Sequence, residues 1–162
     1  MMFKKLIIFV LAVIFVAGCG EHYLYSDTHK MGESGWTYAD SLKFDFEITD
    51  TSKRYNLLLT VHHTPDFSNE NLYVKFTTVF PKGQKALQGK DRVEQVTSLT
   101  LAQKDGQWLG KCSSKECVMR IPIQTNTWFP ESGKYSLLVE QYMRRDSLKA
   151  IKAIDFAIQE KK

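Results

Sequence analysis

Cys19 is the residue whose surroundings point most directly to a chemical reaction. Val16, Ala17 and Gly18 place small side chains immediately before it, which is the pattern that a lipoprotein signal peptidase needs. A thiol in this setting can take a diacylglyceryl group before the leader is cleaved. The sequence therefore predicts lipidation of Cys19. The alternative is an ordinary secretory signal that is cleaved nearby and leaves Cys19 as an unpaired thiol.

The segment before Cys19 has the composition of an export signal. Lys4 and Lys5 form a positive start, and an unbroken apolar run of twelve residues, 6–17, follows them. As a helix this run would span about 18 Å, well short of the roughly 30 Å hydrocarbon core of a bilayer. We expect residues 1–18 to be a signal peptide. The two or three acyl chains of a lipoprotein cysteine would then hold the mature chain at a membrane.

His62 and His63 suggest a metal or catalytic site, particularly with Asp66 three positions later. Adjacent residues of a strand point to opposite faces, so both imidazoles cannot bind one ion unless the strand breaks between them. No third ligand stands nearby in the sequence. We therefore expect one histidine to pack inward with a hydrogen bond and the other to meet solvent. The sequence predicts no metal ion and no other cofactor.

Cys112 and Cys117 are separated by four polar residues that suit the tip of a hairpin. Facing positions on a hairpin lie within the roughly 7 Å between Cα atoms that a disulfide requires. An oxidising compartment outside the cytoplasm favours the bond, so we predict a structural disulfide, with two free thiols as the alternative. The spacing is not that of a redox Cys-x-x-Cys, and no neighbouring histidine completes a zinc site.

The sequence lacks the motifs of common catalytic sites. It has no Gly-x-Ser-x-Gly elbow, no His-Glu-x-x-His helix and no glycine-rich phosphate loop. We therefore predict that the protein is not an enzyme. The formal charge of +4 falls to +2 without the signal peptide, which carries two lysines and no acids. No cluster of basic residues is interleaved with aromatics, so we expect no nucleic-acid partner.

The elements that must position these residues are strands, because apolar and polar residues alternate with a period of two. Pro122 cannot donate a hydrogen bond to a neighbouring strand, so we expect its segment at an edge or a bulge. Asp105-Gly106 predicts a tight turn with a strand returning from Trp108. The last apolar segment fits a helix or a strand, and we expect a turn followed by a strand. The other predicted strands are residues 42–48, 57–61, 72–80, 93–103, 119–123 and 135–139.

Seven or eight short strands without a long amphipathic helix predict an all-β fold. We expect an antiparallel β-sandwich, immunoglobulin-like or jelly-roll-like, with a small barrel as the alternative. Removal of residues 1–18 leaves 144 residues, which is enough for one domain. We expect residues 19–35 to form a lipidated tether and residues 36–162 to form a single β-sandwich domain.

Several segments resemble, in the same order, the GldH family of gliding-motility lipoproteins. Besides the lipobox ending at Cys19, they are WTYADSLKFDF at 36–46, YNL at 55–57, VHHT at 61–64, Phe67, Asn71 and Leu72, DGQWLG at 105–110, GKY at 133–135 and EQYMRRDSL at 140–148. The chain departs from the family where His62 replaces a usual arginine, where two cysteines follow Trp108, and where Phe156 replaces a glycine. The resemblance implies a cell-envelope lipoprotein more firmly than it implies motility itself.

Residues 141–146 lie at a strand end and carry two arginines. In the structural interpretation, Gln141 satisfies backbone groups, Met143 plugs the end of the core, and Arg144 pairs with Asp146 or a neighbouring carboxylate. In the functional interpretation, these four residues form a docking edge for another envelope protein. The sequence leaves both interpretations open.

The resemblance implies a non-enzymatic scaffold or assembly factor of the gliding machinery or its associated secretion apparatus, with envelope proteins as partners. A small-ligand or carbohydrate-binding lipoprotein is the alternative. Its stacking platform would be made of four exposed aromatic residues, Trp36, Trp108, Trp128 and Phe129. An enzyme is a third option, which would require a concave pocket with converging titratable groups.

Gly20 bears on the location of the protein in the envelope. An aspartate after the lipidated cysteine commonly retains lipoproteins in the inner membrane of Gram-negative bacteria, and glycine stands here instead. We therefore expect the outer membrane. Because no run of acidic residues follows Cys19, we expect the periplasmic face rather than the cell surface.

Overall fold

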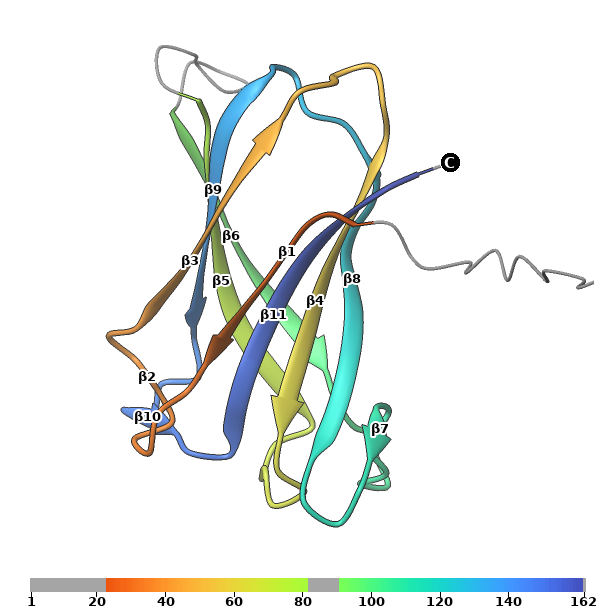
Figure 1. The fold of residues 1–162 in the computed structure, drawn as a ribbon. Coiled ribbons are helices and arrows are strands. Elements are labelled where there is room, and N and C mark those ends of the chain that lie inside the picture. The colour runs from red at the N-terminus through yellow and green to blue at the C-terminus, as the bar shows by residue number, and fades with distance from the viewer. Residues whose placement is uncertain (1–22, 82–90, 162) are drawn as a thin grey trace, which may run out of the picture.

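The fold is seen in a computed structural model that describes residues 23–81 and 91–161 (Figure 1). The predicted signal peptide and Cys19 lie outside the described residues. The described residues form the strands β1 Tyr23–Lys30, β2 Trp36–Thr37, β3 Ser41–Ile48, β4 Tyr55–His63, β5 Asn71–Val79, β6 Arg92–Thr100, β7 Lys111–Cys112, β8 Cys117–Thr127, β9 Gly133–Gln141, β10 Ser147–Leu148 and β11 Ile151–Glu160.

Two large antiparallel sheets pack face to face. One has the strand order β1-β11-β4-β8-β7 and the other the order β3-β9-β5-β6, while β2 and β10 pair separately. The period-two pattern explains this arrangement, since every second residue of β3 is buried and the others are exposed. The prediction of an all-β antiparallel sandwich is confirmed. Within the described residues, no helix is long and apolar enough to cross a membrane.

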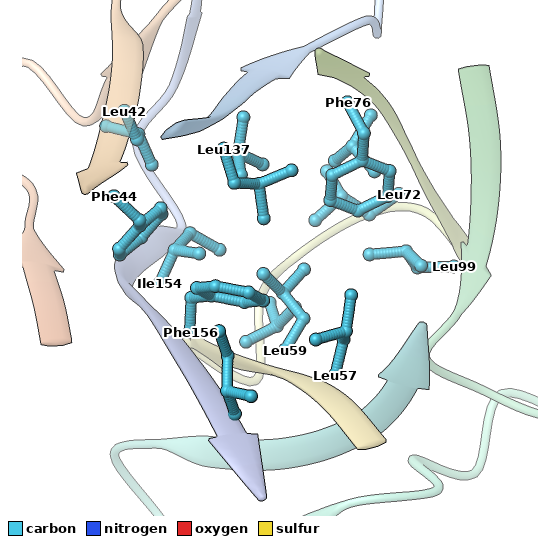
Figure 2. Packing of buried hydrophobic residues seen from close by; sticks show 14 of the residues in the cluster. Leu42, Phe44, Leu57, Leu59, Leu72, Phe76, Leu99, Leu137, Ile154 and Phe156 are labelled. Carbon is cyan, nitrogen blue, oxygen red and sulfur yellow. The ribbon is translucent and has the colours of Figure 1, made fainter. Parts of the chain in front are cut away.

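The core lies between the two sheets and draws aromatic and aliphatic side chains from both. Figure 2 shows Phe44 and Leu137 of one sheet facing Leu59 and Phe156 of the other. The rings of Phe44 and Phe156 lie 5.5 Å apart, which is contact distance across the sandwich. Full burial of one such side chain contributes about 1.5–3 kcal/mol, so this layer is what holds the sheets together.

Residues 23–30 correct the predicted domain boundary. They form β1, which pairs with β11 at the edge of the larger sheet. Tyr25 packs its ring against Phe46 and Phe156, with centroids 5.8 and 6.0 Å apart, and burial raises the pKa of Tyr25 to about 12. The predicted tether of residues 19–35 is therefore wrong for residues 23–30, and the sandwich begins before residue 36. Since this edge strand leaves most of its side chains exposed, its apolar alternation is weak.

The region around residues 102–123 agrees with prediction in part. Gly106 has a φ of 87°, as the predicted Asp-Gly turn requires. The strand predicted to return from Trp108 is wrong, because Trp108 makes only an isolated bridge with Ala102. Pro122 lies where the pairing of β8 with β4 shifts register, so the predicted bulge is present. The last apolar segment is strand β11, as expected.

The long strands run between two ends of the sandwich, which we call the tether end and the far end. The tether end carries Tyr23 at the start of β1, Ser52 between β3 and β4, and Trp128 after β8 (Figure 1). The far end carries the connection from β4 to β5, the hairpin of β7 with β8, and the segment from Gln141 to β10. The position of a site can therefore be given relative to Tyr23, the first described residue of the chain.

Candidate functional site

The turn after β9 at the far end is closed by a buried glutamine. Gln141 is 1 % exposed, its Nε2 donates to the carbonyl oxygen of Arg145 at 2.6 Å, and its Oε1 accepts from the Met143 backbone N–H at 2.9 Å. These two bonds hold the chain in a tight turn in which Arg144 has a φ of 54°. A non-glycine residue in this left-handed region needs such support. Gln141 thus satisfies backbone groups, as its structural interpretation requires.

The other residues of the turn divide between the core and solvent. Met143 is half-buried against the core, and its Sδ accepts a hydrogen bond from the Tyr73 backbone N–H at 3.2 Å. Arg144 and Asp146 are exposed. Among the described residues, no carboxylate lies within ion-pair distance of Arg144, so the predicted pair with Asp146 is not formed. The turn therefore fixes the backbone of Arg144, while its guanidinium group makes no ion pair with a described residue.

Three exposed tyrosines surround this turn, and backbone hydrogen bonds tie them to it. Tyr38, Tyr73 and Tyr142 are 55 %, 46 % and 45 % exposed. The Tyr142 N–H donates to the Tyr73 carbonyl oxygen at 2.8 Å, and the Tyr38 N–H donates to the Asp146 carbonyl oxygen at 2.9 Å. We call Tyr38, Tyr73, Tyr142 and Arg144 the tyrosine patch. It gathers three segments that are distant in the sequence.

An ion pair stabilises the sheet surface beside the tyrosine patch. Lys75 Nζ of β5 lies 2.7 Å from Glu140 Oε2 of β9, and the two residues face each other in the strand register. The hydrogen bond to Glu140 raises the pKa of Lys75, with a further contribution from the nearby Tyr38. The tyrosine patch was not predicted from the sequence. One residue of the patch, Tyr73, could be placed on the exposed face of its strand from the alternation of residues 72–80.

The aromatic residues predicted as a stacking platform do not form one. Trp36 is 0 % exposed, Phe129 is 7 % exposed, and Trp108 is half-buried against the core. Trp128 alone of these four is exposed, at 50 %, and it lies at the tether end. The expected row of exposed rings is therefore corrected. Trp36, Trp108 and Phe129 are covered because the two sheets and their connections pack against these rings.

The two histidines of β4 lie on opposite faces, as predicted. His63 is fully buried, donates from Nδ1 to the Thr64 carbonyl oxygen at 2.9 Å, and packs edge-on against Trp108 at 4.5 Å. Burial lowers the pKa of His63 from its ordinary value of 6.5, which favours the neutral form of the ring. His62 lies on the outer face between Glu116 and Asp155, at 3.2 and 2.8 Å. The part of the chain that the structure describes has no cluster suited to a metal ion.

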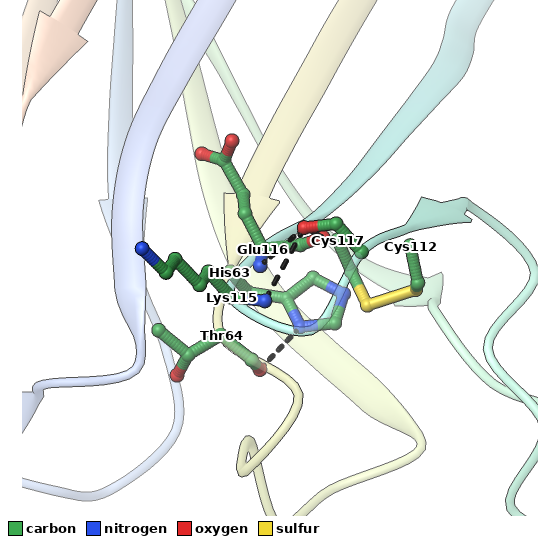
Figure 3. Close-up of a disulfide and its surroundings, with 7 residues drawn as sticks. His63, Thr64, Cys112, Lys115, Glu116 and Cys117 are labelled. Carbon is green, nitrogen blue, oxygen red and sulfur yellow. Dashed lines mark hydrogen bonds between the residues drawn. A yellow bond between two sulfur atoms is a disulfide. The ribbon is translucent and has the colours of Figure 1, made fainter.

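Cys112 and Cys117 face each other across the short hairpin of β7 and β8 (Figure 3). Their sulfur atoms are bonded in the structure, and their Cα atoms lie 4.0 Å apart. Ser113 orders the tip, because its Oγ accepts from the backbone N–H groups of Lys115 and Glu116 at 3.2 and 3.1 Å. Cys117 is buried and pairs in register with His63, which attaches the hairpin to β4.

The fold and these surfaces define a class of protein: a small antiparallel β-sandwich with a structural disulfide hairpin and an exposed aromatic surface at one end. A family model described as "GldH lipoprotein" matches residues 23–158. The chain therefore belongs to the GldH lipoprotein family, and the resemblance stated from its sequence is confirmed. As a family member, it is a lipoprotein that is lipid-anchored in the cell envelope. The match begins where β1 begins.

Two relatives agree with this family. The chain is 23% identical over 139 residues to a "Gliding motility lipoprotein GldH homolog" of Christiangramia forsetii, covering 86% of this chain and 80% of that protein. It is 23% identical over 161 residues to the "Gliding motility lipoprotein GldH" of Flavobacterium johnsoniae, covering 95% of each. The similarity thus extends over the whole sandwich and is not confined to one motif. The family is not known for enzymatic activity.

Proposed function

We propose that this lipoprotein is a non-enzymatic scaffold or assembly factor that holds another envelope protein at its far end, within the gliding machinery or its associated secretion apparatus. One observation carries the proposal. The chain enters the sandwich at Tyr23, four residues after Cys19, whereas the tyrosine patch surrounds the turn after β9 at the far end. A lipid on Cys19 would therefore leave the tyrosine patch facing away from the membrane.

The composition of the tyrosine patch supports a protein partner. Tyrosine and arginine are enriched at the energetic centres of protein interfaces, since they offer large contact areas with polar tips. Gln141 and Met143 hold the backbone of Arg144 in one conformation, so little entropy is lost there on binding. In this proposal Arg144 and Asp146 contact the partner, while Gln141 and Met143 position the turn.

The charge around the tyrosine patch indicates the kind of partner surface. Arg144, Arg145 and Lys149 are exposed here against two exposed acids, Asp146 in the turn and Asp40 beside Tyr38. Lys75 is neutralised by Glu140. An excess of positive charge steers association toward an acidic surface. We therefore propose that the partner presents carboxylates to Arg144.

The anchor and its location complete the proposal. Lipidation falls on Cys19, and Gly20 after it favours the outer membrane, with the sandwich on the periplasmic side. The family relationship supports the lipid anchor, and the gliding role is supported by the relatives of Christiangramia forsetii and Flavobacterium johnsoniae, whose names describe gliding motility lipoproteins.

Affinity capture of the tagged native lipoprotein after gentle crosslinking tests this proposal. Arg144→Glu should abolish co-purification of the partner while the urea midpoint of unfolding stays unchanged, because Arg144 is exposed and makes no ion pair among the described residues. Arg54→Glu is the matched control, since it makes the same charge change at an exposed residue of the tether end. Retained partners in Arg144→Glu, or equal losses of partner and stability, would contradict the docking role.

A further inference from the structure

An apolar pocket of about 280 Å³ opens between the two sheets toward the tether end. Its walls come from both sheets and from the connection after β8, and they include Leu57, Val93, Trp128, Phe129, Leu137 and Phe156. The pocket lies on the side of the sandwich where β6 is the edge of one sheet and β8 is the last long strand of the other. It is unrelated to the tyrosine patch at the far end.

The pocket exists because none of the described residues closes the sandwich along β6. Val93 and Gln95 pair in register with Thr78 and Phe76, which places them on the inward face of their strand. Both are nevertheless exposed, and Val93 is 45 % exposed. An inward valine that solvent reaches marks an incomplete layer of the core. Apolar surface of this kind is typical of a binding site.

The opening is elongated rather than round. A second cavity of about 110 Å³ shares Leu57, Val93 and Leu137 with the first and extends along the inner faces of β6 and β8 to Thr97 and Ile123. The polar side chains along this slot are threonines and glutamines, and no charged group lines it among residues 23–81 and 91–161. A narrow apolar slot that lacks charge fits a linear hydrocarbon chain better than a polar ligand.

We propose that this slot takes one acyl chain of the lipid on Cys19 of the same protein. The inference rests on lipidation of Cys19 and not on the docking role of the tyrosine patch. Three residues lie between Cys19 and Tyr23, so the four Cα-to-Cα steps have a reach of at most about 14 Å. A lipoprotein cysteine carries two or three acyl chains, so the others remain in the bilayer when one enters the slot.

The strand register places the mouth of the slot at the limit of this reach, so the acyl chain, which extends beyond Cys19, covers the remaining distance into the slot. Tyr23 pairs with Gln159, Gln159 pairs with Asn56, and Asn56 Oδ1 accepts from the Asn126 backbone N–H of β8 at 3.0 Å. This row crosses three strand spacings, about 14 Å, from the start of β1 to β8 at the mouth of the slot. Trp128 follows two residues later and is half exposed at that mouth. An indole at this position suits the boundary between a membrane and water.

A photoreactive fatty acid tests the proposal in the intact lipoprotein. Cells are fed a fatty acid with a diazirine at its end, and the purified lipidated protein is irradiated and digested for mass spectrometry. We expect cross-links from the acyl chain on Cys19 to the peptides that contain Val93 and Trp128 in the same molecule. Val93→Trp should fill the slot and remove these cross-links.

Val96→Trp is the matched control, because Val96 is 50 % exposed on the same strand but pairs with Lys75 and points outward. Its cross-links should match those of the parent. If Val93→Trp does not fold, Gln124→Trp offers a second block from β8. Cross-links that persist in the blocked variant, or that reach only bilayer lipids, would overturn the proposal.

A second arm identifies the source of the acyl chain. The lipidated protein, made without the photoreactive fatty acid, is irradiated in vesicles that contain a diazirine-labelled phosphatidylcholine. The proposal requires that Val93 and Trp128 peptides stay unlabelled, because the acyl chain on Cys19 already occupies the slot. Labelling of these peptides would assign the slot to a bilayer lipid, and cross-links to another protein would assign it to a partner strand. Either result would overturn the assignment to the anchor on Cys19.

Discussion

His63 carries a stability effect that can be observed by changing the pH. Its ring is fully buried against Trp108 and Phe67, and burial lowers its pKa from the ordinary value of 6.5. Below pH 6.5 the unfolded chain therefore binds a proton that the folded chain excludes. Protonation favours the unfolded state, so the free energy of unfolding is fully retained above about pH 6.5 and falls as the pH decreases below it.

Urea unfolding at about pH 7.5 and about pH 5.5 tests this effect of His63. The parent should lose stability between the two values, and His63→Phe should lose less, since phenylalanine fills the site and does not titrate. The carboxyl groups of Asp45, Asp50 and Asp66 have pKa values lowered from 3.8 by hydrogen bonds, so their contributions disappear only at lower pH. An equal fall in the parent and in His63→Phe would show that His63 does not cause it.

At the scale of elements, the packing of β1 decides whether residues 23–30 are a tether or part of the folded sandwich. Tyr25 packs on Phe46 and Phe156, whereas the neighbouring Leu24 is 39 % exposed on the other face. Tyr25→Ala should lower the free energy of unfolding by about 2 kcal/mol, less than the full cost of a deeply buried ring. Leu24→Ala should change it by less than about 0.5 kcal/mol. Equal midpoints for both variants in urea would show that residues 23–30 are not part of the folded sandwich.

The hairpin of β7 and β8 is the second element whose contribution can be measured. Closing so short a loop with a disulfide contributes about 2 kcal/mol in the chain-entropy model. In a Cys19→Ser background the remaining thiols are Cys112 and Cys117. We expect no alkylation before reduction, and Cys112→Ser should lower the free energy of unfolding by about that amount. Cys112 is exposed, so the substitution itself changes little packing. Two freely alkylated thiols in the unreduced protein would contradict the bond.

At the scale of the whole molecule, the arrangement of the two ends predicts an orientation on the membrane. Strand β4 has nine residues and is therefore about 30 Å long, with Ser52 near one end and Asp66 near the other. A donor dye on Ser52→Cys should transfer energy to acceptor-labelled lipid headgroups more efficiently than the same dye on Asp66→Cys. A long flexible insertion after Gly20 should remove the difference. Equal transfer from both sites without the insertion would contradict an anchored tether end.

Much of this protein was determined by the sequence itself. Alternating side chains fixed the strands at 42–48, 72–80 and 135–139, because the period of a strand is a local property of its residues. The same local logic placed His62 and His63 on opposite faces and set Cys112 opposite Cys117. The predicted export signal, the predicted lipidation motif and the ordered family segments also consist of residues that are adjacent in the sequence. These features can therefore be predicted without knowledge of the long-range packing.

The tertiary structure decided which surfaces are covered. Trp36 and Phe129 became core because the sheets closed over them, and β1 joined the sandwich through one ring, Tyr25, despite its weak alternation. The tyrosine patch and the open slot beside β6 each combine residues from distant parts of the chain. Burial depends on what packs against a residue from elsewhere in the sequence, so local patterns cannot specify these two surfaces.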